Sequence, residues 1–164
     1  MRPSWNFATL PAELHDRFRE YARRHISELA QPDTMLTLTN PGLASNAAVL
    51  VTIFPNLRVV FVKRDVNDIA LRMFQTNYRS GNAYSYNLKN IKRHIEWYND
   101  TMHAMKAKFP DIVHVVNYED MVEDPKATLE VVADFCGLPR PEGDIAPVPD
   151  DRGCSEPYKE FMKF

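Results

Sequence analysis

Glycine and cysteine are scarce in this chain, and the scarcity of each excludes a class of site. The 164 residues include only five glycines, and the first of them is Gly42. No glycine-rich phosphate-binding loop therefore precedes that position. The two cysteines, Cys136 and Cys154, are too few for a disulfide framework and have no CxxC partner, so a zinc or redox site has little support. The histidines form neither HxxxH nor HExxH, and we expect no metal site.

The chain also lacks a charge excess and a long apolar run. Its formal net charge of -2 at pH 7 argues against general nucleic-acid binding, which needs a basic surface. No apolar run approaches the roughly 20 residues that span a bilayer. The opening segment "MRPSWNFATLPAELHDRF" has no continuous apolar stretch typical of a secretory signal. We therefore expect an ordinary globular protein in the cytoplasm, with no membrane span.

What the sequence does contain is an alternation of helix-like and strand-like segments. Apolar residues recur at helical spacing in the segments 11–30, 40–54, 65–79, 88–109 and 125–136. The strand-like segments are 34–39, 57–63 and 112–117. The uninterrupted apolar run in the second of these is typical of a parallel strand that is covered on both faces. About three strands separated by helices predict an α/β fold with a short parallel sheet flanked by helices.

The pattern changes after residue 138. The stretch "LPRPEGDIAPVPDDRG" contains four prolines and little periodicity, which indicates an extended segment that wraps the domain. We therefore divide the chain into an α/β domain over residues 1–138 and an extended C-terminal tail over residues 139–164.

Charged and polar side chains follow two of the predicted strands at their carboxyl ends. Lys63 and Arg64 lie at the end of one strand, and Tyr118 begins the sequence "YED" after the other. Ligands of parallel sheets bind beyond the carboxyl ends of the strands. An arginine that precedes a helix can bind a phosphate with its guanidinium, together with the helix amides. The alternative is that Arg64 pairs with Asp65, Asp68 or Glu119 and only ends the strand.

Longer stretches of the sequence resemble the sulfotransferase family, most closely its bacterial and tyrosylprotein-sulfotransferase-like branch. The segments "FPNLRVVFVKRDVNDIALRMF", "AYSYNL" and "VVNYEDMVEDPKATLEVVADFCGL" carry the resemblance, collinear from about residue 34 to 138. These enzymes transfer a sulfuryl group from PAPS (3′-phosphoadenosine 5′-phosphosulfate) to a hydroxyl or amine. The resemblance implies an incomplete P-loop-NTPase-like three-layer fold, PAPS or its product PAP as co-substrate, and no metal.

The resemblance assigns roles to three residues. Arg64 matches the arginine that grips the 3′-phosphate of the nucleotide, and Tyr118 matches the tyrosine that lies against the adenine. Arg72 stands where the family has a serine that also binds the 3′-phosphate. An arginine at that position either adds charge to the phosphate site or is a surface substitution on a helix that binds nothing. The resemblance identifies no catalytic residue in this chain.

Two features of the family have no counterpart. Thr39 stands where related chains have a lysine near the sulfuryl group, and a threonine cannot stabilise developing charge as a cation does. The strand, glycine-containing loop and helix that cradle the 5′-phosphosulfate are missing, with the base that follows them. In the family this strand lies between those matched by 57–63 and 112–117. We therefore expect these two strands to pair directly with each other. Otherwise each strand exposes an unsatisfied edge, which would indicate an oligomer or a missing N-terminal segment.

Three functions remain open from the sequence. The first is the 3′-phosphoadenosine-binding part of a PAPS-dependent sulfotransferase whose acceptor is a sugar, a peptide tyrosine, a lipid or a small alcohol. The second is a catalytically inactive module that binds a nucleotide, a glycan or a protein partner, which Thr39, Arg72 and the missing loop favour. The third is a nucleoside kinase or another P-loop relative, which explains "NYEDMVEDP" less well.

Overall fold

A computed structural model of the chain describes residues 11–29, 34–54, 56–78 and 81–163. The chain divides into two compact units, Met1–Leu57 and Arg58–Phe164, and each is described by itself. None of the helices in the described ranges is both long enough and apolar enough to cross a membrane.

The described part of the first unit is helical. It contains α1 (Ala12–Leu29), the 3-10 helix η2 (Pro41–Asn46) and α2 (Ala47–Ile53). The side chain of Asn40 accepts a hydrogen bond from the Gly42 amide and caps η2. Arg19 of α1 donates its Nε–H to the carbonyl oxygen of Ile53 at 2.5 Å. The helices expected over 11–30 and 40–54 are therefore confirmed, the second as a 3-10 turn that continues into α2.

The strand expected over residues 34–39 is wrong. Residues 34–40 form neither helix nor strand, and the side chains of Met35, Leu36 and Leu38 are exposed. Alternating threonine and apolar residues favour a strand only where a neighbouring strand pairs with them. Within the described residues no strand does so, since the sheet contains β1 and β2 alone.

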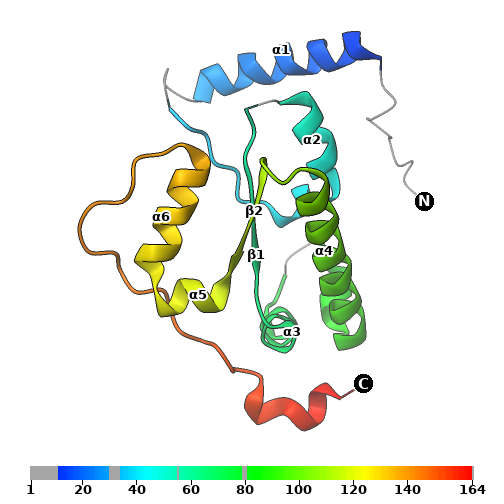
Figure 1. Cartoon of the computed structure of the whole chain (residues 1–164). Helices are drawn as coiled ribbons and strands as arrows, with labels where there is room; N and C mark the ends of the chain where they lie inside the picture. The colour runs from blue at the N-terminus through cyan, green and yellow to red at the C-terminus, as the bar shows by residue number, and fades with distance from the viewer. Residues whose placement is uncertain (1–10, 30–33, 55, 79–80, 164) are drawn as a thin grey trace. The chain divides into compact units, whose positions relative to one another are not determined.

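The second unit is built around a two-stranded parallel sheet. β1 (Val59–Lys63) pairs with β2 (Val113–Asn117), with Val59 opposite Val113 and Lys63 opposite Asn117. The two strands lie side by side in Figure 1. The expectation that they pair directly with each other is confirmed, and the described residues form two strands instead of about three.

Helices account for most of the second unit. They are α3 (Val66–Gln75), η3 (Ala83–Tyr86), α4 (Leu88–Lys108), α5 (Tyr118–Glu123), α6 (Pro125–Cys136) and η4 (Glu156–Met162). Asp65 is the predicted N-cap of α3, and its carboxylate accepts the amides of Asn67 and Asp68. Gly137 ends α6 at a φ of 68°, a conformation that glycine adopts without steric cost. α5 was not expected, and it begins at Tyr118.

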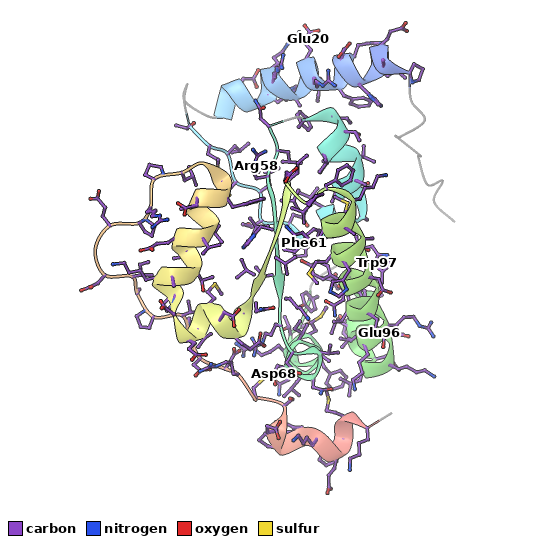
Figure 2. All side chains as sticks on the ribbon, viewed as in Figure 1. Glu20, Arg58, Phe61, Asp68, Glu96 and Trp97 are labelled. Atoms are coloured by element: carbon purple, nitrogen blue, oxygen red, sulfur yellow. The ribbon has the colours of Figure 1, made fainter. Side chains whose placement is uncertain are left out.

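The two faces of the sheet pack against different helices. Phe61 is 3% exposed and meets the ring of Tyr98 in α4 edge-on, with centroids 5.6 Å apart; Phe61 is labelled in Figure 2. His114 points to the other face, because Val60 is its register partner, and it lies 5.2 Å from the ring of Phe135 in α6.

The C-terminal segment returns to the core after a long irregular stretch. Residues 138–151 contain neither helix nor strand. Met162 of η4 is nevertheless buried in one cluster with Ala70, Leu71, Ile91 and Ile95. The end of the described chain is therefore fixed against α3 and α4.

Candidate functional site

The candidate site lies where β1 and β2 end. Lys63 is the register partner of Asn117, so the residues that follow them, Arg64 and Tyr118, leave the sheet next to each other. The guanidinium carbon of Arg64 lies 4.2 Å from the centroid of the Tyr118 ring. This is a cation–π contact. Direct pairing of the two strands therefore brings two of the three predicted site residues together.

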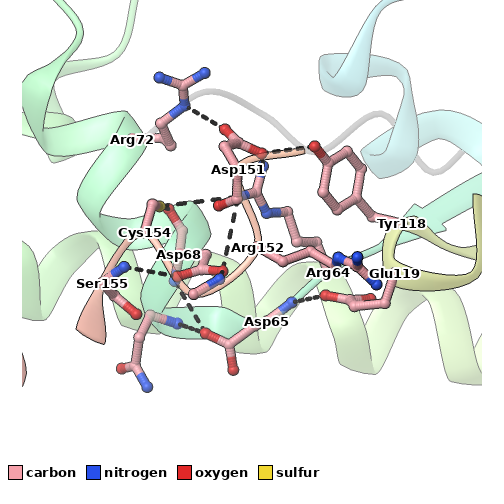
Figure 3. Close-up of polar contacts among 12 residues, drawn as sticks. Arg64, Asp65, Asp68, Arg72, Tyr118, Glu119, Asp151, Arg152, Cys154 and Ser155 are labelled. Atoms are coloured by element: carbon pink, nitrogen blue, oxygen red, sulfur yellow. Dashed lines mark hydrogen bonds and ion pairs between the residues drawn. The ribbon is translucent and has the colours of Figure 1, made fainter. Parts of the chain in front are cut away.

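The carboxylate of Asp151 joins all three predicted site residues. Arg64 Nη1 lies 2.8 Å from Asp151 Oδ1, and Arg72 Nε lies 2.9 Å from Asp151 Oδ2. The Tyr118 hydroxyl donates a hydrogen bond to Oδ1 at 2.6 Å. Figure 3 shows Arg72 and Tyr118 meeting this carboxylate from opposite sides. We call Arg64, Arg72 and Tyr118 the donor corner.

Arg64 is the most enclosed member of the donor corner. Its side chain is 13% exposed, and its Nη2 lies 3.7 Å from Asp68 Oδ2. The same nitrogen donates to the backbone carbonyl of Asp151 at 2.8 Å. The Nε atom is buried and has no hydrogen-bond partner in the part of the chain that the structure describes. A buried N–H without a partner costs about 1–3 kcal/mol, so this position favours one more acceptor.

A second carboxylate, Asp68, holds the tail in place beneath the donor corner. Asp68 is 2% exposed and accepts the amides of Gly153 at 2.7 Å and Ser155 at 2.9 Å. Burial of the carboxyl acts to raise its pKa, but the hydrogen bonds from Ser155 and Gly153 outweigh burial and the pKa is lowered. Asp68 therefore stays ionised and fixes this turn of the tail against α3.

The charges of the corner stabilise one another. The hydrogen bond from Tyr118, followed by that from Arg64, lowers the pKa of Asp151. Burial opposes the charged form of Arg64, but the hydrogen bond to Asp151 outweighs it and raises the pKa of Arg64. The bond to Asp151 also raises the pKa of Tyr118. At neutral pH the corner therefore combines cationic arginines, a carboxylate anion and a protonated phenol.

Glu119 and Thr39, which the sequence also singled out, lie outside the donor corner. Glu119 accepts the amide of Asp65 at 3.0 Å and ties the start of α5 to the start of α3. Thr39 is exposed in the irregular part of the first unit. The described residues contain no group of three or more His, Cys, Asp or Glu side chains that could hold a metal ion.

The sequence prediction named Asp68 as a possible partner of Arg64 but missed Asp151. The alternative in which Arg64 meets a nearby carboxylate is correct in part, since Arg64 approaches Asp68, but its close partner is Asp151, 87 residues away. One signal was available for Asp68, which lies one helical turn after Arg64. The signal for Asp151 is weaker: "PDDRG" is an acidic turn that follows a proline-rich stretch.

Comparison with known proteins identifies the family. The model of the sulfotransferase family matches residues 1–142. The chain therefore belongs to the sulfotransferase family, as the resemblance in its sequence suggested. The matched range includes the donor corner, whereas Asp151 lies after it.

An uncharacterized protein of Aquifex aeolicus (strain VF5) is also similar to the chain. The two are 23% identical over 94 residues, which is 56% of this chain and 12% of that protein. The chain thus covers only a small part of the length of this relative. No solved structure matches the chain.

Proposed function

We propose that this chain is the 3′-phosphoadenosine-binding part of a sulfotransferase that transfers a sulfuryl group from PAPS to a hydroxyl or amine acceptor. The observation that carries the proposal is the convergence of Arg64, Arg72 and Tyr118 on one anionic group, the carboxylate of Asp151. Donors that already surround two carboxylate oxygens are arranged to surround the oxygens of a phosphate.

The donor corner suits a 3′-phosphate in charge as well as in shape. A phosphate monoester has a charge of roughly -1.5 to -2 at pH 7 and three strong acceptor oxygens. Two arginines oppose that charge, and the Tyr118 hydroxyl adds a neutral donor at the same place. The position of Arg72 beside the same carboxylate as Arg64 favours the interpretation in which this arginine adds charge to the phosphate site.

In the proposed reaction, PAPS supplies the sulfuryl group and this chain supplies binding and orientation. The donor corner holds the 3′-phosphate, which takes no part in bond making. Binding energy at such a remote group fixes the position of the reacting phosphosulfate relative to the acceptor. We assign no residue in the described part of this chain to the stabilisation of charge on the transferring sulfuryl group.

A thermal-shift titration with PAP tests this proposal. A ligand at 100 times its dissociation constant adds about 2.7 kcal/mol of stability, which raises the melting temperature by roughly 5–11 °C for a protein of this size. We expect Arg64→Ala to abolish the shift. Arg140→Ala is the matched control, because Arg140 forms an exposed ion pair with Asp134, and this variant should keep the full shift.

Two results would overturn the proposal. One is a PAP shift that Arg64→Ala retains, since the nucleotide would then bind elsewhere. The other is the absence of a shift both in the wild type and in the Asp151→Asn variant described below, when both proteins melt cooperatively.

A catalytically inactive binding module is the second candidate function. The occupied state of the donor corner favours it, because Asp151 already satisfies the charges of Arg64 and Arg72 without a ligand. The same contacts of Asp151 with Arg64 and Arg72 are expected if the corner serves only to fix the tail. The PAP titration separates the two candidates in part, and detectable sulfuryl transfer to an acceptor would exclude the inactive module.

A further inference from the structure

The donor corner cannot hold a phosphate and Asp151 at the same time. Asp151 Oδ1 occupies the hydrogen-bonding position in front of Arg64 Nη1 and the Tyr118 hydroxyl, and Oδ2 occupies that of Arg72 Nε. A phosphate that binds these donors would place its oxygens where the carboxylate oxygens now lie.

Charge adds to this exclusion. The positive charges of Arg64 and Arg72 face the negative charge of Asp151, and Asp68 Oδ2 lies 3.7 Å from Arg64 Nη2 while it also accepts the Gly153 amide. A nearly dianionic phosphate next to a retained Asp151 would exceed the positive charge of the corner. The repulsion is strongest where water is excluded, and Arg64 is largely buried.

We propose that Asp151 is a built-in competitor for the nucleotide: its carboxylate occupies the place of the 3′-phosphate and must leave before a nucleotide with a 3′-phosphate binds. This inference rests on the proposed function, which supplies the ligand. Asp151 belongs to the tail and lies after the range that the family model matches.

The contacts of the tail allow Asp151 to leave the donor corner while the residues that follow it stay bound. Asp68 holds the amides of Gly153 and Ser155, and Met162 is buried in the core. Gly153 has a φ of 70° and lies at the turn that begins this anchored part of the tail. The exchange therefore requires the short segment from Asp150 to Arg152 to move, with loss of the hydrogen bond from the Cys154 amide to the Asp151 carbonyl oxygen. Pro149 and the contacts of Asp68 and Met162 stay in place.

Tyr118 is prepared for the loss of Asp151. Its hydroxyl lies 2.5 Å from the carbonyl oxygen of Pro149 as well as 2.6 Å from Asp151 Oδ1. A phenol carries a single proton, so the two acceptors share one donor. When the carboxylate leaves, the hydroxyl retains an acceptor until a phosphate arrives.

Titration calorimetry with two nucleotides tests the inference. PAP carries the 3′-phosphate, and adenosine 5′-monophosphate has the same base and 5′-phosphate without it. We expect Asp151→Asn to bind PAP at least tenfold more tightly than the wild type does and to leave the affinity for adenosine 5′-monophosphate unchanged. Asp134→Asn is the matched control, because the described side-chain contacts of Asp134 are an exposed ion pair and hydrogen bonds with Arg140, and its PAP affinity should equal that of the wild type.

The outcomes distinguish this inference from the proposed function. If PAP binds the wild type and Asp151→Asn equally, or binds the variant more weakly, and Arg64→Ala removes binding, then the nucleotide site is real and Asp151 is a supporting residue. That result overturns the competitor alone. If neither protein binds PAP, the proposed function fails, and the competitor fails with it.

Hydrogen exchange of the wild-type protein gives a test that needs no variant. The Arg152 amide bonds Asp150 Oδ1 at 3.1 Å within the segment that must move. Saturating PAP should speed exchange at Arg152 and leave the amides of Gly153 and Ser155 protected by Asp68. Unchanged or slower exchange at Arg152 while PAP is bound would overturn the displacement of Asp151.

Discussion

Asp68 should be one of the most important polar residues for the stability of the second unit. Replacing it by asparagine keeps the shape but removes the charge and one acceptor oxygen. The amides of Gly153 and Ser155 then compete for one oxygen, and the new NH2 group faces one of these amides. A hydrogen bond to a charged group contributes about 1.5–3 kcal/mol, and an unpaired buried N–H costs about 1–3 kcal/mol. We therefore expect Asp68→Asn to lower the free energy of unfolding by about 3 kcal/mol.

Urea denaturation measures this loss directly, and thermal unfolding should show a decrease in Tm of roughly 6–12 °C. The control is Asp150→Asn, which removes an exposed ion pair with Arg152 and should change stability by less than about 0.5 kcal/mol. A loss below about 1 kcal/mol for Asp68→Asn, with an unchanged urea m-value, would show that the tail is not held by this carboxylate. The position of Asp151 in the donor corner would then need another explanation.

The pH dependence of stability provides an independent check on Asp68. Its pKa is lower in the folded protein than in the unfolded chain, so the unfolded state binds more protons as the pH falls below about 5. The contribution of Asp68 is fully present above the unfolded pKa and is lost as the pH falls through the folded pKa. As the pH falls below about 5, the free energy of unfolding should therefore decrease more for the wild type than for Asp68→Asn. Parallel curves for the two proteins would contradict the assigned shift.

Three further substitutions have simpler expectations. Gly137→Ala forces a Cβ into a left-handed conformation at φ 68° and should cost about 1 kcal/mol in thermal unfolding; a stabilised variant would show that α6 does not end in this way. Met102→Ala removes a side chain that is 0% exposed and should cost about 2–5 kcal/mol in urea, and a smaller loss would mean that the core around α4 is loosely packed. Arg72→Ser truncates a side chain that is 62% exposed and should change stability by less than about 1 kcal/mol. It should weaken PAP binding severalfold in calorimetry, and an unchanged affinity would show that Arg72 does not bind the nucleotide.

The parts of the fold that were predictable are those that local sequence determines. α3, α4 and α6 have strong apolar periodicity and recognisable caps, such as Asp65 and Gly137, and their positions were predicted within a few residues. β1 and β2 were predicted from their apolar runs, but the expectation that the first run is covered on both faces is wrong, because only Phe61 of β1 is buried and Val60 and Val62 are exposed. The segment 34–39 has a comparable strand propensity but no partner, and pairing is a property that local sequence does not contain.

The same distinction applies to the site. Arg64 and Tyr118 were predictable because each directly follows a strand, and the carboxyl ends of parallel strands meet at one edge. Asp151 was not, because it reaches the corner from an irregular tail 87 residues further along the chain. Asp68 was named only as a possible partner of Arg64, and its bonds to the Gly153 and Ser155 amides were not predictable, because they depend on the return of the tail.

The geometry of the donor corner depends on the direct pairing of β1 with β2. Neighbouring strands lie about 4.8 Å apart, and this spacing allows Arg64 to stack on Tyr118 and one carboxylate to reach both. A strand inserted between them would separate the two residues by about 10 Å, and Asp151 could no longer bridge them. The order of the sheet is therefore a testable premise of the whole site.

A cysteine pair tests this premise. Val60 is the register partner of His114, and the spacing of adjacent strands falls in the 4.4–6.8 Å range of Cα separations that disulfides accept. In a background with Cys136 and Cys154 replaced by alanine, Val60→Cys with His114→Cys should form an intramolecular disulfide under mild oxidation. Non-reducing electrophoresis would show it as a faster-migrating species near the 19.0 kDa monomer.

The control pair is Val62→Cys with His114→Cys, which lies on the same face but two residues out of register. The separation of such diagonal neighbours is roughly 7–8 Å, so this pair should cross-link far more slowly. If neither pair forms a monomeric disulfide in a cooperatively folded protein, β1 and β2 are not neighbours. Arg64, Tyr118 and Asp151 would then not form one site, and both the proposed nucleotide corner and its internal competitor would have to be abandoned.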